Sequence, residues 1–185
     1  MKLGFISDIH GNYNGLRIAL AHLLMTGCEI ICLGDIVSEN SDENEKCISL
    51  LKRKCIQTVR GQHDDTCAKV NSPSVSAQAR QYLHTLPEII THSDIVCVHD
   101  NPLQKAREGK GMWNSGSYIR SNLEADVVFQ DFFPNAPEMR LVFFGHSHEP
   151  AIFARKKQYQ LQFGQPIPLK EDELYLINPG CIGGR

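Results

Sequence analysis

The chain has 185 residues, a net charge of −2 at pH 7, 42% hydrophobic and 22% charged residues. This length and composition predict one globular domain, 1–185, with a sizeable core, and they exclude a disordered chain. The mild acidity argues against duplex nucleic acid or an anionic membrane as a partner, and no apolar run is long enough to form a membrane helix.

Cysteine usage indicates a reducing compartment. The seven cysteines are an odd number and contain no C-x-x-C pair. The first twelve residues, "MKLGFISDIHGN", do not form a signal peptide, because Asp8 and His10 interrupt the apolar stretch. We therefore expect free thiols and a cytoplasmic location, and a cysteine-rich zinc site is not expected.

The first third of the chain alternates between strand-like and helix-like segments. Short apolar runs at 2–7, 29–35 and 56–61 predict buried strands. Leucines at helical spacing predict a helix over 14–25, and Gly27 follows as a stop signal. A second helix is predicted over 42–54, where Asp42 and Glu45 have the spacing of a capping box. This alternation favours a parallel sheet covered by helices.

The remaining segments are less regular. A third helix is predicted within 75–84, and two more strands at 94–100 and 140–148. The segment 101–135 is interpreted as a loop or lid region with one helix. Beyond residue 150 we expect a hairpin over 151–164 and a last strand over 173–180.

Five of the apolar runs end in side chains that can bind a metal ion. These side chains are Asp8 and His10, Asp35, Gln62 with His63 and Asp64, His99, and His146 with His148. Ligands bind beyond the carboxyl ends of the strands in an open α/β sheet, so residues distant in sequence would meet at one edge. Each short motif alone is weak, and a loop histidine is most often solvated. All five together are difficult to attribute to chance, whereas His22, His84 and His92 lack such partners and are interpreted as ordinary surface or cap residues.

The mixture of imidazoles and carboxylates favours a transition metal. Mn²⁺ is the first choice, with Fe, Ni, Co or Zn as alternatives, because Mg²⁺ and Ca²⁺ prefer shells of oxygen ligands. The set exceeds the needs of one tetrahedral ion, so we expect two divalent ions about 3.5–4 Å apart with one bridging carboxylate. Such a pair of ions supplies hydroxide at neutral pH and stabilises both the attacking and the leaving oxygen of an in-line displacement at phosphorus. A phosphate ester is therefore the natural substrate.

The motifs "SDIHGN", "GDIV", "GQHDD", "CVHD", "GHSHEP" and "NPGCIGGR" resemble those of the calcineurin-like metallophosphoesterase superfamily, in particular its small single-domain bacterial and archaeal phosphodiesterases. The resemblance spans nearly the whole chain. It implies a mixed α/β (α+β) fold, a two-sheet β-sandwich flanked by helices rather than a three-layer doubly wound sheet.

The resemblance also implies a role for each site residue. It assigns the first metal to Asp8, His10 and His148, with Asp35 bridging. The second metal would be held by Gln62, His99 and His146. His63 would lie near the leaving group, and Asp64 would orient it. The reaction would be direct attack on phosphorus by a hydroxide held between the two ions, with no covalent intermediate.

Three departures from the family pattern affect this interpretation. The family has Asn where this chain has Gln62, whose oxygen is one methylene further out, so we expect a weaker second metal site, with complete loss of that site as the alternative. Cys181 replaces a common Ser and is interpreted as a structural change. The sequence ends at Arg185, where family members continue, so the last strand or strands of the second sheet could be missing or supplied by a partner.

The substrate is left open between a phosphodiester, a nucleotide and a phosphoprotein. Cations and aromatic residues within 101–120 could hold a nucleotide, although a solvated loop with one or two buried aromatic residues is the favoured interpretation: Lys105, Arg107, Lys110, Trp113, Tyr118 and Arg120. One alternative function is a non-catalytic scaffold of the same fold, like the small retromer subunit, with Gln62 as its support. Another is a nuclease for short single strands. A homo-oligomer is compatible with the sequence.

Overall fold

The computed structural model describes residues 2–69, 73–103, 118–162 and 164–184, and within them the chain forms two β-sheets. The first sheet has the order β1-β2-β3 and is parallel; its strands are β1 (Leu3–Ile6), β2 (Glu29–Cys32) and β3 (Gln57–Thr58). The second sheet has the order β4-β5-β6-β9-β7-β8; its strands are β4 (Ile89–His92), β5 (Ile95–Val98), β6 (Leu141–Phe143), β7 (Ala151–Ala154), β8 (Lys157–Gln158) and β9 (Tyr175–Asn178).

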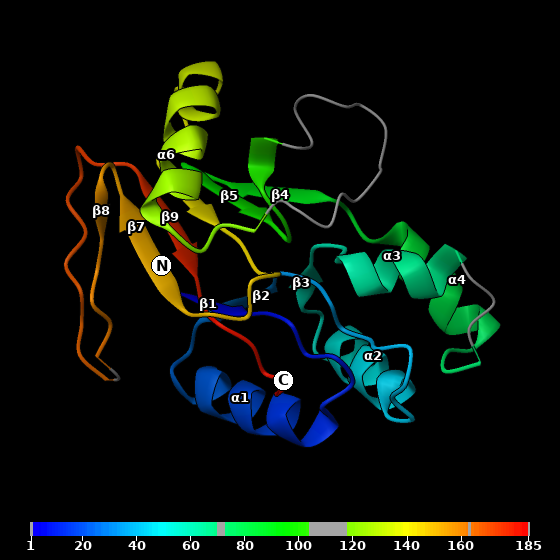
Figure 1. The fold of residues 1–185 in the computed structure, drawn as a ribbon. Helices are drawn as coiled ribbons and strands as arrows, with labels where there is room; N and C mark the ends of the chain where they lie inside the picture. The colour runs from blue at the N-terminus through cyan, green and yellow to red at the C-terminus, as the bar shows by residue number, and fades with distance from the viewer. Residues whose placement is uncertain (1, 70–72, 104–117, 163, 185) are drawn as a thin grey trace.

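Helices cover the outer faces of both sheets (Figure 1). The first sheet packs against α1 (Tyr13–Met25), α2 (Asn44–Arg53), α3 (Gln62–Lys69) and α4 (Ala77–Thr85). The second sheet packs against α6 (Asn122–Asp131), which a short 3₁₀ helix, η1 (Phe133–Asn135), extends. The two sheets therefore form a sandwich between two layers of helices, and the expected fold is confirmed.

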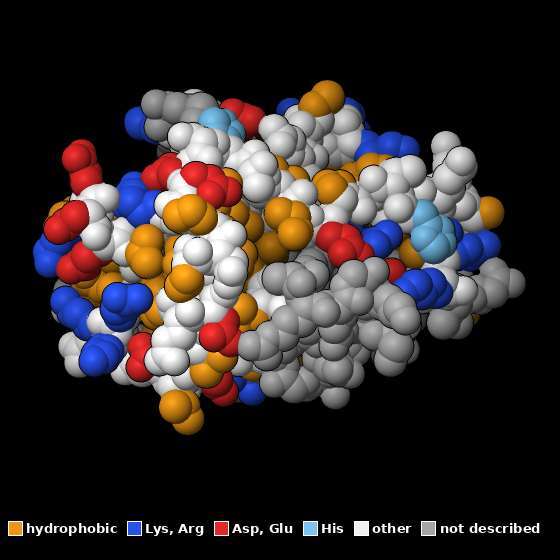
Figure 2. Space-filling view, turned by 90° about the horizontal axis from the view of Figure 1, so that it is seen from above, with side chains coloured by type: hydrophobic (Ala, Val, Ile, Leu, Met, Phe, Trp, Pro, Cys, Tyr) orange, Lys and Arg blue, Asp and Glu red, His pale blue; other side chains and the backbone are white. Residues whose placement is uncertain are grey.

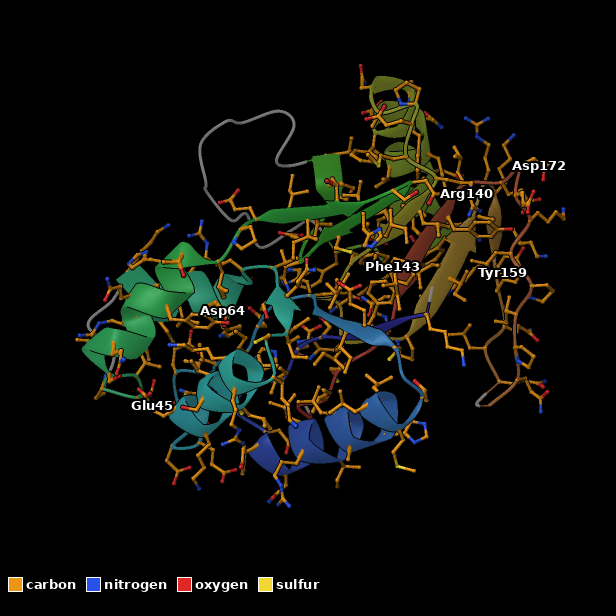
Figure 3. All side chains as sticks on the ribbon, turned by 180° about the vertical axis from the view of Figure 1, so that it is seen from behind. Glu45, Asp64, Arg140, Phe143, Tyr159 and Asp172 are labelled. Carbon is orange, nitrogen blue, oxygen red and sulfur yellow. The ribbon has the colours of Figure 1, made fainter. Side chains whose placement is uncertain are left out.

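A compact apolar layer joins the two sheets. Because side chains alternate along a strand, β2 directs Ile31 toward the second sheet and Ile30 toward the helices. Across this layer the rings of Phe5 and Phe143 stack with centroids 3.6 Å apart and planes 10° apart. Phe143 lies in the middle of the molecule, between the sheets (Figure 3). This packing sets the two sheets face to face and fixes where their strands end.

Most of the predicted elements are present, with shorter strands. The helices predicted over 14–25, 42–54 and 75–84 are α1, α2 and α4, and the single helix expected within 101–135 is α6. The expected hairpin over 151–164 is the pair β7 and β8. The strand expected over 140–148 ends at Phe143, so the residues that follow form a loop. The last described strand, β9, lies inside its sheet between β6 and β7.

Two elements were not predicted. Helix α3 begins at Gln62, where no helix was predicted, and two carboxylates in its first turn, Asp64 and Asp65, favour a helix amino terminus. Strand β4 pairs antiparallel with β5 through a two-residue turn at Ser93 and Asp94. Ser93 has a φ of 54°, a left-handed conformation suited to such a turn.

The predicted capping box at Asp42 and Glu45 is wrong. Helix α2 begins two residues later, at Asn44, and its N-cap residue Glu43 makes no capping hydrogen bond through its side chain. Glu45 instead accepts a 2.7 Å hydrogen bond from the backbone amide of Ser76, at the start of α4. A tertiary contact therefore uses the side chain that local spacing had assigned to the cap.

The surface seen from the α6 side carries cationic and anionic side chains interspersed with hydrophobic ones (Figure 2). Leu123 and Val127 of α6 are exposed. None of the helices in the described part of the chain is long and apolar enough to cross a membrane.

Asp64 connects the ends of β2 and β3. Its side chain is fully buried, and it accepts hydrogen bonds from the backbone amides of Ile36 and Val37 at 2.9 and 3.2 Å and of Gly61 at 3.0 Å. Figure 3 shows Asp64 at α3. One carboxylate thus satisfies three amide groups from two loops.

Replacing Asp64 with Ala should lower the free energy of unfolding by about 3 kcal/mol, because buried amide donors would lose their acceptor. The measurement is urea unfolding in the presence of a chelator, which removes any contribution of bound metal. Asp126→Ala is the matched control, since Asp126 accepts a long 3.3 Å hydrogen bond from an exposed backbone amide, that of Lys156. A loss below about 1 kcal/mol for Asp64→Ala would contradict this bracing role.

Candidate metal centre

The predicted ligands meet where parallel strands of both sheets end. Asp8 and His10 follow β1, and Asp35 follows β2. His99 follows β5, while His146 and His148 follow β6. A cavity of about 420 Å³ at this edge is lined by Asp35, Gln62, His63, His146 and His148 among others. The structure therefore brings these residues into one place, as the strand-end pattern predicts.

The side chains form three groups, in each of which the potential ligand atoms lie within 4.8 Å of one another. The groups are Asp8 with His10 and His148, His10 with Asp35 and His63, and Asp35 with His99 and His146. His10 and Asp35 each belong to two groups. The Asp35 Oδ2 atom lies 3.2 Å from Nε2 of His99 and 3.8 Å from Nε2 of His10. Asp35 thus lies between the two outer groups.

The backbone is strained at the ligands. Among the described residues, eight non-glycine residues have a positive φ, and five of these are predicted ligands: Asp8, His10, Asp35, His146 and His148. Their φ values lie between 47° and 64°, a left-handed region that costs free energy for residues with a Cβ atom. Strain concentrated in this way is typical of a functional site.

Backbone hydrogen bonds hold the strained loops together. The carbonyl oxygen of Asp35 accepts hydrogen bonds from the amides of Ile9 and His10, at 2.8 and 2.9 Å. A side chain at Gly61 would collide with the backbone nitrogen and carboxylate of Asp35, so only glycine fits at this position. The loops after β1, β2 and β3 therefore interlock closely around the Asp35 carboxylate.

Further contacts orient the ligands of the second sheet. The Nδ1 atom of His99 donates to the carbonyl oxygen of Leu33 at 2.7 Å, which directs Nε2 toward Asp35. The amide of His146 donates to both carboxylate oxygens of Asp8 at 3.1 Å. A hydrogen bond from the second ring nitrogen to a carbonyl is the usual support of a metal-binding histidine.

The "NPG" motif braces the loop after β6. Buried Asn178 donates to the carbonyl oxygen of Gly145 at 2.7 Å and to the Ser147 hydroxyl at 2.9 Å. Beyond it, the amides of Ile182 and Gly183 donate to the carbonyl oxygen of Asp8. The C-terminal motif therefore positions ligand loops of both sheets without lining the cavity itself.

Buried charges interact strongly at this site. Burial alone would raise the pKa of Asp35, but the neighbouring histidines, His99 first, hold it below its usual range. Burial lowers the pKa of His99, yet the Asp35 carboxylate raises it to about 10. Burial, together with the charge of Asp35, raises the pKa of Asp64 to about 7. Because the buried carboxylates of Asp35 and Asp64 repel each other, a cation nearby would stabilise both.

The donor set fits a divalent transition metal. The Nε2 atom of His146 is buried and has no hydrogen-bond partner among the described residues. Nε2 of His148 lies 3.0 Å from Nε2 of His10 and 3.3 Å from the carboxylate of Asp8. Imidazole nitrogens and carboxylate oxygens that converge in this way are suitable ligands for Mn, Fe or Zn.

The structure corrects the role implied for Asp64. The Asp64 carboxylate accepts hydrogen bonds from backbone amides. The imidazole of His63, which Asp64 was expected to orient, pairs with a different carboxylate. The Nδ1 atom of His63 lies 2.8 Å from Oε2 of Glu39, four residues after Asp35. Glu39 was missed because 24 residues separate it from His63, and only the position of α3 brings the two together.

The remaining residues considered in the sequence lie in different parts of the structure. Gln62 is half-buried at the start of α3 and lines the cavity, and its role as a ligand remains a prediction. His22 and His84 are exposed, and His92 is half-buried in β4, away from the ligand groups. Of the cationic and aromatic cluster in 101–120, Tyr118 and Arg120 are described, while Lys105, Arg107, Lys110 and Trp113 lie outside the described residues.

A two-sheet sandwich with histidines and carboxylates at its strand ends is the architecture of a metal-dependent phosphoesterase. The sequence matches the family described as the calcineurin-like phosphoesterase superfamily domain over residues 1–185. The chain therefore belongs to this superfamily, and the resemblance drawn from the motifs is confirmed. It is a metal-dependent hydrolase of phosphate esters.

Individual relatives agree with this assignment. The chain is similar to an uncharacterised protein of Methanocaldococcus jannaschii, with 28% identity over 98% of this chain and 76% of that protein. A metallophosphoesterase structure from Sphaerobacter thermophilus has 26% identity and a TM-score of 0.78, covering 99% of this chain and 77% of the other. The structure of a proposed diadenosine tetraphosphatase shares the fold, with 20% identity and a TM-score of 0.55 over 95% of this chain and 81% of the other.

Metal binding should stabilise the fold. Adding Mn²⁺ at a hundredfold excess over its dissociation constant should raise the melting temperature by roughly 5–10 °C, because only the folded chain gathers the ligands. Asp35→Asn keeps the shape of the side chain and should abolish most of this rise. The control Asp126→Asn, in α6, should show the same Mn²⁺-induced rise in melting temperature as the wild type. A Mn²⁺-induced shift of the same size in Asp35→Asn and the wild type would show that the ion binds elsewhere.

Proposed function

We propose that the chain hydrolyses phosphodiesters with two divalent ions, preferably Mn²⁺. The observation that carries this proposal is the position of the Asp35 carboxylate, whose Oδ2 atom lies 3.2 Å from Nε2 of His99 and 3.8 Å from Nε2 of His10. The first ion would be held by Asp8, His10 and His148, and the second by Gln62, His99 and His146, with Asp35 common to both. We expect the second ion to exchange more readily because of the longer Gln62 side chain. When bound, the ions activate water and neutralise charge on the phosphoryl oxygens.

The remaining chemistry belongs to the protein. Water gives up a proton to solvent and its oxygen bonds to phosphorus. The bond from phosphorus to the leaving oxygen breaks, and the leaving oxygen takes up a proton. His63 lines the cavity and is the group suited to deliver this proton. Its Nδ1 atom is engaged by Glu39, so Nε2 is the nitrogen that can meet the leaving group. Glu39 is thus a positioning residue that fixes the orientation of the His63 ring.

The cavity and the thiols support two further parts of the proposal. A cavity of about 420 Å³ accommodates a small phosphate ester or part of a nucleotide. None of the seven cysteines, all of which are described, forms a disulfide, and Cys32, Cys47, Cys67 and Cys97 are buried. Reduced cysteines in such number support a cytoplasmic location.

Metal-stripped protein should hydrolyse bis-p-nitrophenyl phosphate only after Mn²⁺ is added back. Asp35→Ala should lower this rate by about 100-fold or more, since the carboxylate common to both ligand groups is removed. The assay follows nitrophenolate release, with metal content measured on the same samples. Full activity with one ion per chain would exclude the two-metal mechanism. No turnover with Mn, Fe, Ni, Co or Zn would instead support a scaffold function.

Replacing His63 with Ala should slow substrates with poor leaving groups more than nitrophenyl esters. A positioned general acid contributes about 10²–10⁴-fold where the leaving oxygen needs a proton, and nitrophenolate hardly needs one. The measurement compares kcat for an alkyl and a nitrophenyl ester of the same phosphate. Glu39→Gln should show the same pattern with a smaller loss. Equal losses on both esters would rule out a leaving-group role.

A further inference from the structure

One wall of the cavity is formed by the segment that enters α6. Tyr118 and Arg120 line the same cavity as Asp35 and His146. The residue between them, Ile119, is 2% exposed and belongs to the core beneath α6. The burial of Ile119 anchors the segment, and Tyr118 and Arg120 on either side of it line the cavity. Neither of them is required by the hydrolytic mechanism above.

Tyr118 connects this wall to the metal centre. Its ring stacks on the imidazole of His146, with centroids 4.3 Å apart and planes 3° apart. The guanidinium carbon of Arg120 lies 4.1 Å from the centroid of the Tyr118 ring. Arg120 is therefore no further from the His146 ring than the sum of these two distances. A substrate bound at the ligand groups would have its next chemical group within reach of Arg120.

The backbone at Arg120 is held by a capping box. The amides of Arg120 and Ser121 donate to one carboxylate oxygen of Glu124, at 2.8 and 2.7 Å. The Ser121 hydroxyl also pairs with this oxygen, at 2.9 Å. With the backbone held by Glu124 and the guanidinium resting on Tyr118, little order has to be gained when Arg120 binds an anion.

Charge determines what Arg120 can bind. Among the described residues that line the cavity, it is the one with a permanent positive charge. Asp35 and Glu149 supply negative charge to the same cavity. The bound metal ions would take up the scissile phosphoryl group, so Arg120 is left for another anion. A guanidinium can bind two phosphate oxygens at once, which makes a phosphoryl group the best-matched partner.

We propose that Arg120, positioned by Tyr118, forms a subsite for a second phosphoryl group of the substrate, next to the one that is hydrolysed. This inference rests on the proposed phosphodiesterase function and narrows its substrate to compounds with at least two phosphoryl groups, such as nucleotides. Tyr118 acts by holding the guanidinium, and Arg120 contacts the substrate.

The test uses two chromogenic substrates that share the scissile bond and the leaving group. Thymidine 5′-(p-nitrophenyl phosphate) has one phosphoryl group, and its 3′-phosphorylated form has two. Arg120→Ala should lower kcat/KM for the 3′-phosphorylated substrate by about tenfold or more, mainly through KM, because a charge-assisted contact is lost. The rate for the other substrate should stay within about twofold, since it does not reach the subsite.

Three further variants sharpen the result. Arg120→Lys keeps the positive charge but not the planar guanidinium, so it should lose part of the preference for the 3′-phosphorylated substrate. Tyr118→Phe keeps the aromatic ring and should retain this preference. Arg17→Ala removes a cation of α1, outside this cavity, and is the control with both substrates unchanged. Equal losses on both substrates in Arg120→Ala, or none on either, would overturn the subsite.

The test of the Arg120 subsite can be distinguished from the test of the proposed phosphodiesterase function. If neither substrate is hydrolysed with any metal, the phosphodiesterase proposal fails. The subsite is then decided by calorimetric titration of thymidine 3′,5′-bisphosphate and thymidine into wild-type and Arg120→Ala protein. Binding of the bisphosphate that is weakened about tenfold by Arg120→Ala would support it. Binding that does not change, or no binding to the wild type, would overturn it.

Discussion

The apolar contact between the two sheets determines everything else in this molecule. Phe5 and Phe143 stack face to face, and Ile31, Leu33, Val59 and Cys97 complete the layer around them. Because β1, β2 and β3 run parallel, as do β5, β6 and β9, this contact superimposes the carboxyl ends of both sets of strands. Polar side chains that follow the strands then meet without a long loop to carry them. A small chain can therefore gather many candidate metal ligands in one place.

The cost of the site is visible in the backbone and in the buried charges. Five predicted ligands have left-handed φ values, and Asp35 and Asp64 place two carboxylates in the interior. Neighbouring hydrogen bonds keep this arrangement in place, with Asp64 accepting from three amides and the Asp35 carbonyl from two. The loops are thus preorganised, and bound cations would add stability where the chain alone is strained.

The two-sheet fold was predictable from the resemblance of the motifs to a known superfamily, whereas the alternation of strands and helices alone indicated a parallel sheet covered by helices. The meeting of the candidate ligands at one edge was predictable because each of them follows an apolar run. Apolar runs followed by Asp or His mark the strand ends, and the motifs around Asp8, Asp35 and His146 indicate the two-sheet architecture. The contact of Glu39 with His63 was not predictable, since it depends on α3, a helix whose polar sequence resembles a loop. The same limit applies to Glu45, whose spacing suggests a cap but which binds Ser76 of another segment. Long-range contacts of single polar side chains leave no periodic signal.

The hydrogen bonds from Ile182 and Gly183 to the Asp8 carbonyl have a consequence for biosynthesis. They join the first ligand loop to residues more than 170 positions later, and β9, which lies inside its sheet, is also made late. A nascent chain on the ribosome can form β1, β2 and their helices early, yet it cannot complete the ligand cluster until residue 183 has emerged. We expect metal acquisition to follow the emergence of residue 183, so the concentration of free ions in the surrounding compartment would select which metal is bound.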